Sequence, residues 1–178
     1  MSMERRNCTE LRMESPGKLV GYAAVFNAPS HDLGGFTERV KPGAFARSLK
    51  SPDSIRALYD HDGKDVLGRV GAGTLRLAED QRGLRFEIDL PPTTVGKDLG
   101  VLVERGDVAG ASFAFRVPEN GDEWRSTDNG VERYLHDVDL HEITVTANPA
   151  YPDTTVAKRR LNRKPRLLIA MKWLESVT

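Results

Sequence analysis

The serine in "ASFAFRV", Ser112, stands among apolar residues, and its hydroxyl could act as a nucleophile. Side chains in a strand alternate between two faces. One face would carry the larger apolar side chains, with Ala111, Phe113, Phe115 and Val117 in line. Ser112 would project from the other face with Ala114 and Arg116, next to small neighbours that leave room for a substrate. On this segment alone, a small strand residue is the simpler interpretation, because few strand serines are nucleophiles.

A nucleophilic serine needs a base to take its proton and a group to orient that base. His61, in "YDHDG", falls at the end of a predicted strand, where a scaffold presents working side chains. Glu142, in "LHEITV", shares the polar face of its predicted strand with Leu140 and Thr144, whereas His141 lies on the opposite face. A carboxylate on that face could orient an imidazole if the two strands were close. A solvated polar role is the competing interpretation for each residue.

A metal site is the second chemical hypothesis. Asp137, Asp139 and His141 would share one face of a straight strand, and carboxylates with imidazole bind zinc or manganese. This spacing is nonspecific, so a metal-dependent hydrolase is the lesser alternative. The single cysteine, Cys8, excludes a disulfide framework and a Cys-ligated zinc site, and fits a reducing compartment. The glycines of "GRVGAG" open no helix, so no dinucleotide cofactor is expected.

Many short strands with two helices between them must position these residues. Apolar and alternating segments predict strands at 18–27, 36–40, 54–62, 66–90 (a pair), 111–117 and 131–147, the last as one long strand or two with a bulge. Helical spacing predicts helices at 41–50 and 93–105, the second capped by Thr93 or Thr94 and ended by Gly106. The fold class is therefore mainly β with helices (α+β), as a β-barrel or sandwich.

The charge distribution divides the chain into a body and a tail. Basic and acidic residues balance at 26 each, but residues 157–178 hold seven Lys or Arg and one Glu. We predict a domain at 1–156 and a basic tail at 157–178, in which Leu167, Met171 and Leu174 suggest a short amphipathic helix. No signal peptide or membrane-spanning run is present, so an intracellular protein without membrane contact is expected. The tail lacks interleaved aromatic residues, so specific nucleic-acid binding is not predicted.

The ordered set of segments resembles a known family. "GYAAVFN", "FTERVKPGAFARSL", "ALYDHD", "LGRV", "GLRFEIDLP", "GDVAGASFAFRV" and "LHEITVTANPAYPDT" follow one another as in the prohead maturation proteases of tailed bacteriophages. These serine peptidases are related in fold and chemistry to herpesvirus assemblin. The resemblance covers roughly residues 18–156, and it implies an assemblin-like β-barrel with surrounding helices.

The resemblance also implies a catalytic set and a biological role. His61 would be the base, Ser112 the nucleophile and Glu142 the third member, with adjacent His141 as the alternative because the herpesvirus relatives use a histidine there. Arg116 is a weak candidate to bind the oxyanion. The enzyme would act inside the assembling procapsid, in the cytoplasm of the bacterial host, on the major capsid protein or a scaffold protein and on itself. The relatives suggest a homodimer. A non-catalytic capsid or scaffold protein on the same fold is the alternative.

Overall fold

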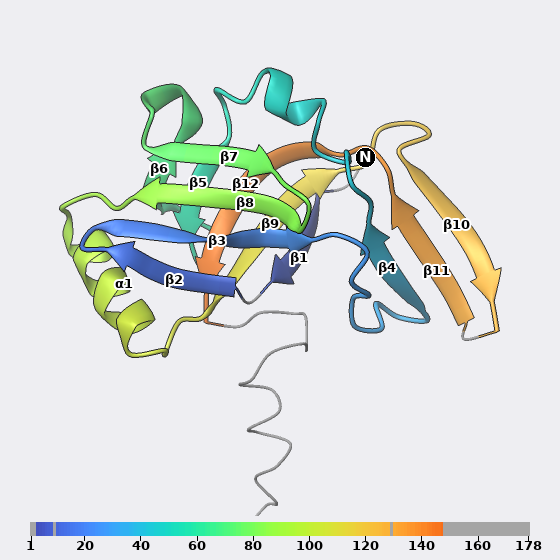
Figure 1. The fold of residues 1–178 in the computed structure, drawn as a ribbon, viewed down its shortest axis with the longest axis horizontal. Helices are drawn as coiled ribbons and strands as arrows, with labels where there is room; N and C mark the ends of the chain where they lie inside the picture. The colour runs from blue at the N-terminus through green and yellow to red at the C-terminus, as the bar shows by residue number, and fades with distance from the viewer. Residues whose placement is uncertain (1–2, 9, 129, 148–178) are drawn as a thin grey trace, which may run out of the picture.

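Three β-sheets and one α-helix make up the computed structural model, which describes residues 3–8, 10–128 and 130–147 (Figure 1). The predicted domain boundary, the basic tail and its amphipathic helix lie outside the described residues. Within the described part of the chain, helices lack the length and hydrophobicity needed to span a bilayer.

A five-stranded sheet carries the candidate site residues. Its order is β1 (Glu4–Cys8), β9 (Gly110–Arg116), β12 (Asp139–Thr146), β5 (Arg56–Tyr59) and β6 (Asp62–Arg69). Only the β12–β5 pair is parallel. β9 and β12 are central strands, and their apolar side chains on one face, such as Phe113 and Ile143, belong to the main core.

A four-stranded antiparallel sheet lies in front of the first in Figure 1 and packs against it. Its order is β2 (Glu10–Ser15), β3 (Lys18–Val25), β8 (Gly83–Asp89) and β7 (Leu75–Glu79). Leu19, Phe86 and Ile88 of this sheet join Phe113 of β9 in one buried apolar cluster. Burial of such side chains is the main favourable term in folding, at roughly 25 cal/mol per Å² of apolar surface.

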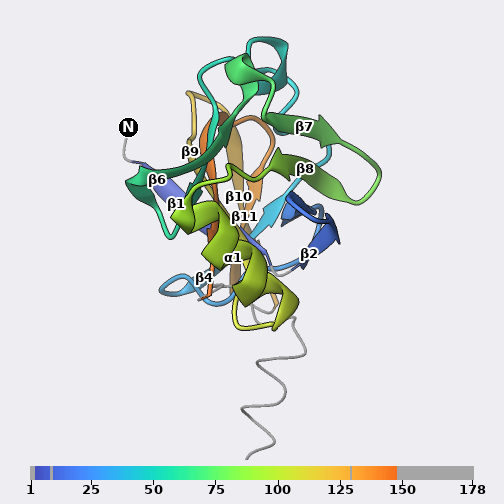
Figure 2. The same ribbon diagram turned by 90° about the vertical axis from the view of Figure 1, so that its left-hand side faces the viewer.

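The single described α-helix, α1 (Thr94–Glu104), connects β8 to β9 and lies across one end of the molecule (Figure 2). The Thr93 hydroxyl accepts a hydrogen bond from the Gly96 amide, as expected for an N-cap. Leu99 and Val103 bury the inner face of the helix. Gly106 has a φ of 77°, so a left-handed residue follows the helix end as predicted.

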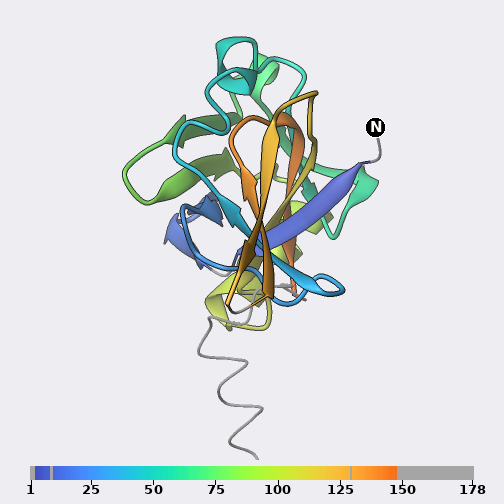
Figure 3. The ribbon, with the colours of Figure 1, turned by 90° about the vertical axis from the view of Figure 1, so that its right-hand side faces the viewer.

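A three-stranded sheet of β10 (Asp122–Thr127), β11 (Gly130–Leu135) and β4 (Phe36–Val40) projects beside the first two. In Figure 3 this twisted sheet lies toward the viewer, and the blue β1 runs from the N-terminus toward it. β11 pairs with β4 in parallel although more than 90 residues separate them, and this register places Arg133 opposite Glu38 and Leu135 opposite Val40.

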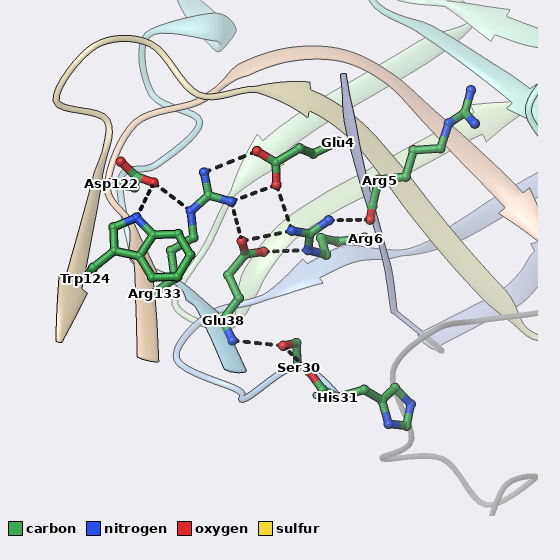
Figure 4. A network of polar contacts seen from close by, with 9 residues as sticks. All are labelled: Glu4, Arg5, Arg6, Ser30, His31, Glu38, Asp122, Trp124 and Arg133. Atoms are coloured by element: carbon green, nitrogen blue, oxygen red, sulfur yellow. Dashed lines mark hydrogen bonds and ion pairs between the residues drawn. The ribbon is translucent and has the colours of Figure 1, made fainter. Parts of the chain in front are cut away.

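A buried ion network joins β1 to this sheet (Figure 4). The Glu38 carboxylate of β4 is fully buried and accepts hydrogen bonds from Arg6 of β1 at 2.7 and 3.0 Å and from Arg133 of β11 at 3.1 Å. Glu4 contacts both guanidiniums, and Asp122 accepts from Arg133 at 2.6 Å. Burial raises the pKa of the Glu38 carboxyl, and the two guanidiniums oppose that rise. β1 is therefore held both by its strand partner and by charge.

Several sequence expectations need correction. The described strands form three separate sheets, so the closed β-barrel is not confirmed, although the mainly β, α+β class is. The helix expected at 41–50 is a series of turns with only a short 3₁₀ segment, Ser48–Lys50, because Gly43 adopts a φ of 90°. The segment 131–147 forms two strands in two different sheets. Strands β1, β2 and β10 were not expected, because β1 and β10 lack a clear apolar alternation and that of β2 is limited to Leu11 and Met13.

Candidate active site

β9 places Ser112 on the face of the five-stranded sheet that points away from the main core. Ala111, Phe113 and Phe115 belong to the apolar cluster, as the alternation predicts. Ser112 faces the other way, but it is 0% exposed, so the open space expected around it is absent. Its Oγ has no hydrogen-bond partner in the described structure. Leaving a buried hydroxyl unsatisfied costs roughly 1–3 kcal/mol, and such groups in native proteins call for an explanation.

A β-bulge in β12 decides which residues face Ser112. Leu140 lies opposite Phe115 and Glu142 opposite Ala114, so His141 is the extra residue on β12. A bulge of one residue switches the faces of the side chains on its two sides. Leu140 therefore packs in the core, contrary to the straight-strand expectation, while Glu142 keeps the predicted face. Glu142 thus lies on the same face of the sheet as Ser112.

His61 lies at the tight turn between β5 and β6. Asp60 and His61 have φ values of 51° and 61°, a left-handed pair that suits a two-residue hairpin turn. The Thr146 hydroxyl donates to the Asp60 carboxylate at 2.7 Å, and the Asp60 amide donates to the Val145 carbonyl at 2.9 Å. These contacts fix the turn against the end of β12 and so fix the position of the His61 backbone, from which the imidazole extends.

The structure brings His61 and Glu142 together. The distance from His61 Nδ1 to Glu142 Oε1 is 2.7 Å, and the two side chains are only 20% and 13% exposed. When Nδ1–H donates to the carboxylate, Nε2 carries the lone pair of the neutral ring and can accept a proton. Glu142 then orients the imidazole and would stabilise its charged form.

The strand register places this pair beside Ser112. Thr144 of β12 lies opposite Ser112 of β9 and next to Leu58 of β5, so these three residues form one row across the sheet. Glu142 precedes Thr144 by two residues on β12, and His61 comes just after the end of β5, so the two residues lie on opposite sides of this row. Their side chains therefore meet along the face that carries Ser112. The Ser112 hydroxyl is not hydrogen-bonded to the ring, a looseness common in the absence of substrate.

His141, the alternative third member, forms no hydrogen bond with His61 in the described structure. Its Nε2 is buried and has no partner in the described structure. The ring lines a cavity of about 270 Å³ with Arg47, Ser48 and Asp139 among its walls. The geometry therefore favours Glu142 over His141 as the partner of His61.

The proposed metal set does not assemble. Asp137 and Asp139 both pair with Arg47, at 2.8 and 2.6 Å, and raise the pKa of its guanidinium. No group of three His, Cys, Asp or Glu side chains within residues 3–8, 10–128 and 130–147 is arranged to hold a metal ion. The hypothesis of a metal site at Asp137, Asp139 and His141 is therefore wrong for this structure, because a cation already occupies the position between the carboxylates.

Arg116 is a poor match for the oxyanion role. It is exposed and lies four residues from Ser112, roughly 13 Å along a strand that rises about 3.3 Å per residue. That Arg116 binds the oxyanion stays a prediction, and its distance from Ser112 does not favour it. Residues that the sequence argument left without a role are Thr144, opposite Ser112, and Asp60 and Thr146, which fix the turn. Alternation placed both threonines on the face of Glu142, and that was the available signal.

Comparison with known proteins gives a family match. The model of the caudovirus prohead serine protease family matches residues 5–166 of the 178-residue chain. No significant match was found among curated proteins or among solved structures. The match spans every strand that carries a candidate site residue and extends beyond the segments that suggested the resemblance. The chain therefore belongs to the caudovirus prohead serine protease family.

Proposed function

We propose that this chain is a serine endopeptidase that cleaves the scaffold segment of the major capsid protein, or a separate scaffold protein, during procapsid maturation. Its family is one of serine peptidases that act in the assembling procapsid of the host. The observation that carries the proposal for these residues is the 2.7 Å contact between His61 Nδ1 and Glu142 Oε1, on the sheet face that carries Ser112. We further propose that the enzyme processes itself and that the tail from residue 157 is a segment for packaging or removal.

The proposed mechanism is acyl transfer through Ser112. His61 Nε2 takes the proton from the Ser112 hydroxyl while Oγ attacks the scissile carbonyl carbon. The carbonyl π electrons move to oxygen, and backbone amides are the candidate donors to that oxyanion. The imidazolium, held by Glu142, then protonates the leaving amine. Water hydrolyses the acyl-enzyme with His61 again as base, which returns Ser112 to its starting state.

Burial of Ser112 adds a step before the chemistry. A side chain that is 0% exposed cannot reach the backbone of a capsid protein, so substrate binding must displace part of its cover. Local rearrangement on substrate binding is a common way to complete a catalytic site and to exclude water from it. The resting structure would therefore react slowly with small serine-directed reagents.

The substitution Ser112→Ala tests the proposal. The chain is co-expressed with the capsid protein encoded by the same phage or prophage, and products are identified by intact mass. We expect the wild-type protein to cleave the capsid precursor and Ser112→Ala to leave it intact, because the alanine has no nucleophile. Ser126→Ala, an exposed serine of β10, is the matched control and should cleave as wild type does. Cleavage by Ser112→Ala would refute the serine mechanism. If the wild-type protein and Ser126→Ala are folded but leave the capsid precursor intact, the non-catalytic alternative is favoured.

A further inference from the structure

Two buried hydroxyls face each other across β9 and β12. Ser112 Oγ and Thr144 Oγ1 are both in residues with 0% exposure, and neither has a hydrogen-bond partner in the described structure. The two residues are direct partners in the antiparallel register. Directly opposite residues in such a pair have Cβ atoms about 4.5–5.5 Å apart, so a side-chain rotation brings their oxygens within hydrogen-bond distance.

Thr144 also lies between the other members of the site. It is two residues from Glu142 on the same face of β12, and its neighbour on β5 is the apolar Leu58. The next residue on the Ser112 face of β9 is Ala114, which has no polar side-chain atom. Of the residues next to Ser112 on β9 and β12, Thr144 is the one whose side chain offers a hydroxyl.

We propose that Thr144 is a positioning residue for the nucleophile. Its hydroxyl donates to Ser112 Oγ when substrate is bound, so that one lone pair of Oγ is occupied and the Ser112 proton is directed to His61 Nε2. As the Ser112 O–H bond breaks and the bond from Oγ to the carbonyl carbon forms, Thr144 keeps its own proton. Its donated hydrogen bond stabilises the negative charge that develops on Oγ. This inference rests on the proposed serine mechanism and adds a residue to it.

The test compares three side chains at one position. Thr144→Val keeps the shape and removes the hydroxyl, whereas Thr144→Ser keeps the hydroxyl and removes the methyl group. Each variant reacts with a fluorescent fluorophosphonate, and the maximal inactivation rate is separated from the half-saturating concentration. We expect Thr144→Val to lower the maximal rate about tenfold, with the half-saturating concentration unchanged, because the lost hydrogen bond is strongest in the transition state, where negative charge develops on Oγ. Thr144→Ser should restore the rate to within about twofold.

Stability and a distant control separate positioning from packing. Thr144→Val removes an unsatisfied buried hydroxyl, so its thermal midpoint should not fall below that of the wild-type protein. Thr37→Val, the same change on β4 of the three-stranded sheet, should leave the labelling rate unchanged. Equal rates for wild type and Thr144→Val would overturn the proposal, as would equal losses in Thr144→Val and Thr144→Ser. Labelling of Ser112→Ala at the wild-type rate, or a wild-type protein that neither reacts with the probe nor cleaves the capsid precursor, would instead refute the serine mechanism and this inference with it.

Discussion

At the scale of single residues, Glu142 is the side chain whose position says most about the chemistry. It is 13% exposed and bonds the ring nitrogen that faces away from the nucleophile in a serine–histidine–acid arrangement. A carboxylate there fixes both the tautomer and the orientation of His61. The Nε2 atom of its neighbour His141 has no hydrogen-bond partner in the described structure.

The substitution Glu142→Gln should therefore disable the site while keeping its shape. The amide can donate to Nδ1 and so favour the wrong tautomer, which in other serine proteases lowers turnover by up to about 10⁴-fold. We expect at least a 100-fold loss in the rate of fluorophosphonate labelling, with a thermal midpoint close to wild type. His141→Gln is the matched control and should label at the wild-type rate. The opposite ranking of the two variants would make His141 the third member.

At the scale of the elements, the β5–β6 turn positions His61 and the β12 bulge positions Glu142. Residues other than glycine, asparagine, aspartate and histidine are disfavoured at positive φ, and the turn uses aspartate and histidine. The bulge shifts β12 by one residue so that an apolar residue before it and a carboxylate after it both reach their proper faces. The site thus depends on a left-handed turn and a β-bulge.

A substitution at Asp60 tests the turn. Asp60→Val places a β-branched side chain at a φ of 51° and removes the acceptor for Thr146, so we expect a loss of about 2 kcal/mol of unfolding free energy. The rate of Ser112 labelling should fall as well, because the turn no longer holds the His61 backbone in position. In Asp60→Asn, asparagine adopts the same φ and keeps an acceptor oxygen, so this variant should retain most of the unfolding free energy and of the labelling rate. Chemical denaturation and labelling kinetics measure the two effects, and equal behaviour of both variants would contradict this account.

Most of the elements could be predicted from the sequence, because burial of one face leaves a pattern in the residues. The others could not, because they depend on contacts with distant parts of the chain. Alternation in "ASFAFRV" and "LHEITVT" predicted the faces of β9 and of β12 beyond its bulge correctly, because burial of one face selects side chains with a period of two. The helix at 41–50 was wrong because its apolar spacing did not reveal the left-handed Gly43. β1 and β2 were missed because their stability comes from strand pairing and, for β1, from ion pairs with residues far along the chain. The bulge and the Thr144–Ser112 register depend on pairing between strands, which a single sequence does not show.

At the scale of the whole molecule, the network around Glu38 ties the five-stranded sheet to the three-stranded one. Charges that are buried on folding contribute little net stability, but removing one partner leaves the others uncompensated. Arg133 is 8% exposed and contacts Glu4, Glu38 and Asp122. Its guanidinium also lies 5.3 Å from the centre of the Trp124 ring. It is the residue on which the relative placement of β1 and the three-stranded sheet most depends.

The substitution Arg133→Met should lower the free energy of unfolding by about 3 kcal/mol at neutral pH, because it leaves buried carboxylates without a counter-charge. The pKa of Glu38, already raised by burial, rises further without Arg133. The folded variant then holds a proton at pH values where the unfolded chain has lost it, so its stability falls as pH rises through the Glu38 pKa. The deficit relative to wild type should therefore shrink as the pH is lowered toward that pKa.

Denaturant unfolding of both proteins across this pH range measures the effect. Arg125→Met, which breaks the half-exposed pair with Glu123 on the neighbouring strand β10, is the control and should cost less than about 1 kcal/mol. A deficit for Arg133→Met that stays constant with pH would show that packing, rather than charge, accounts for its role.

The order of strands in the five-stranded sheet has a consequence for how the protein is made. β9 pairs on one side with β1, where Glu4 lies opposite Phe115, and on the other with β12, where Ser112 lies opposite Thr144. These pairings join distant parts of the chain, and loop closure must precede them during folding. Ser112 leaves the ribosome before Glu142 and Thr144, so at that stage it has no oriented base. On the proposed mechanism, Ser112 can gain its partners only after β12 has emerged, and a nascent protease of this topology would be inert toward its own unfinished chain.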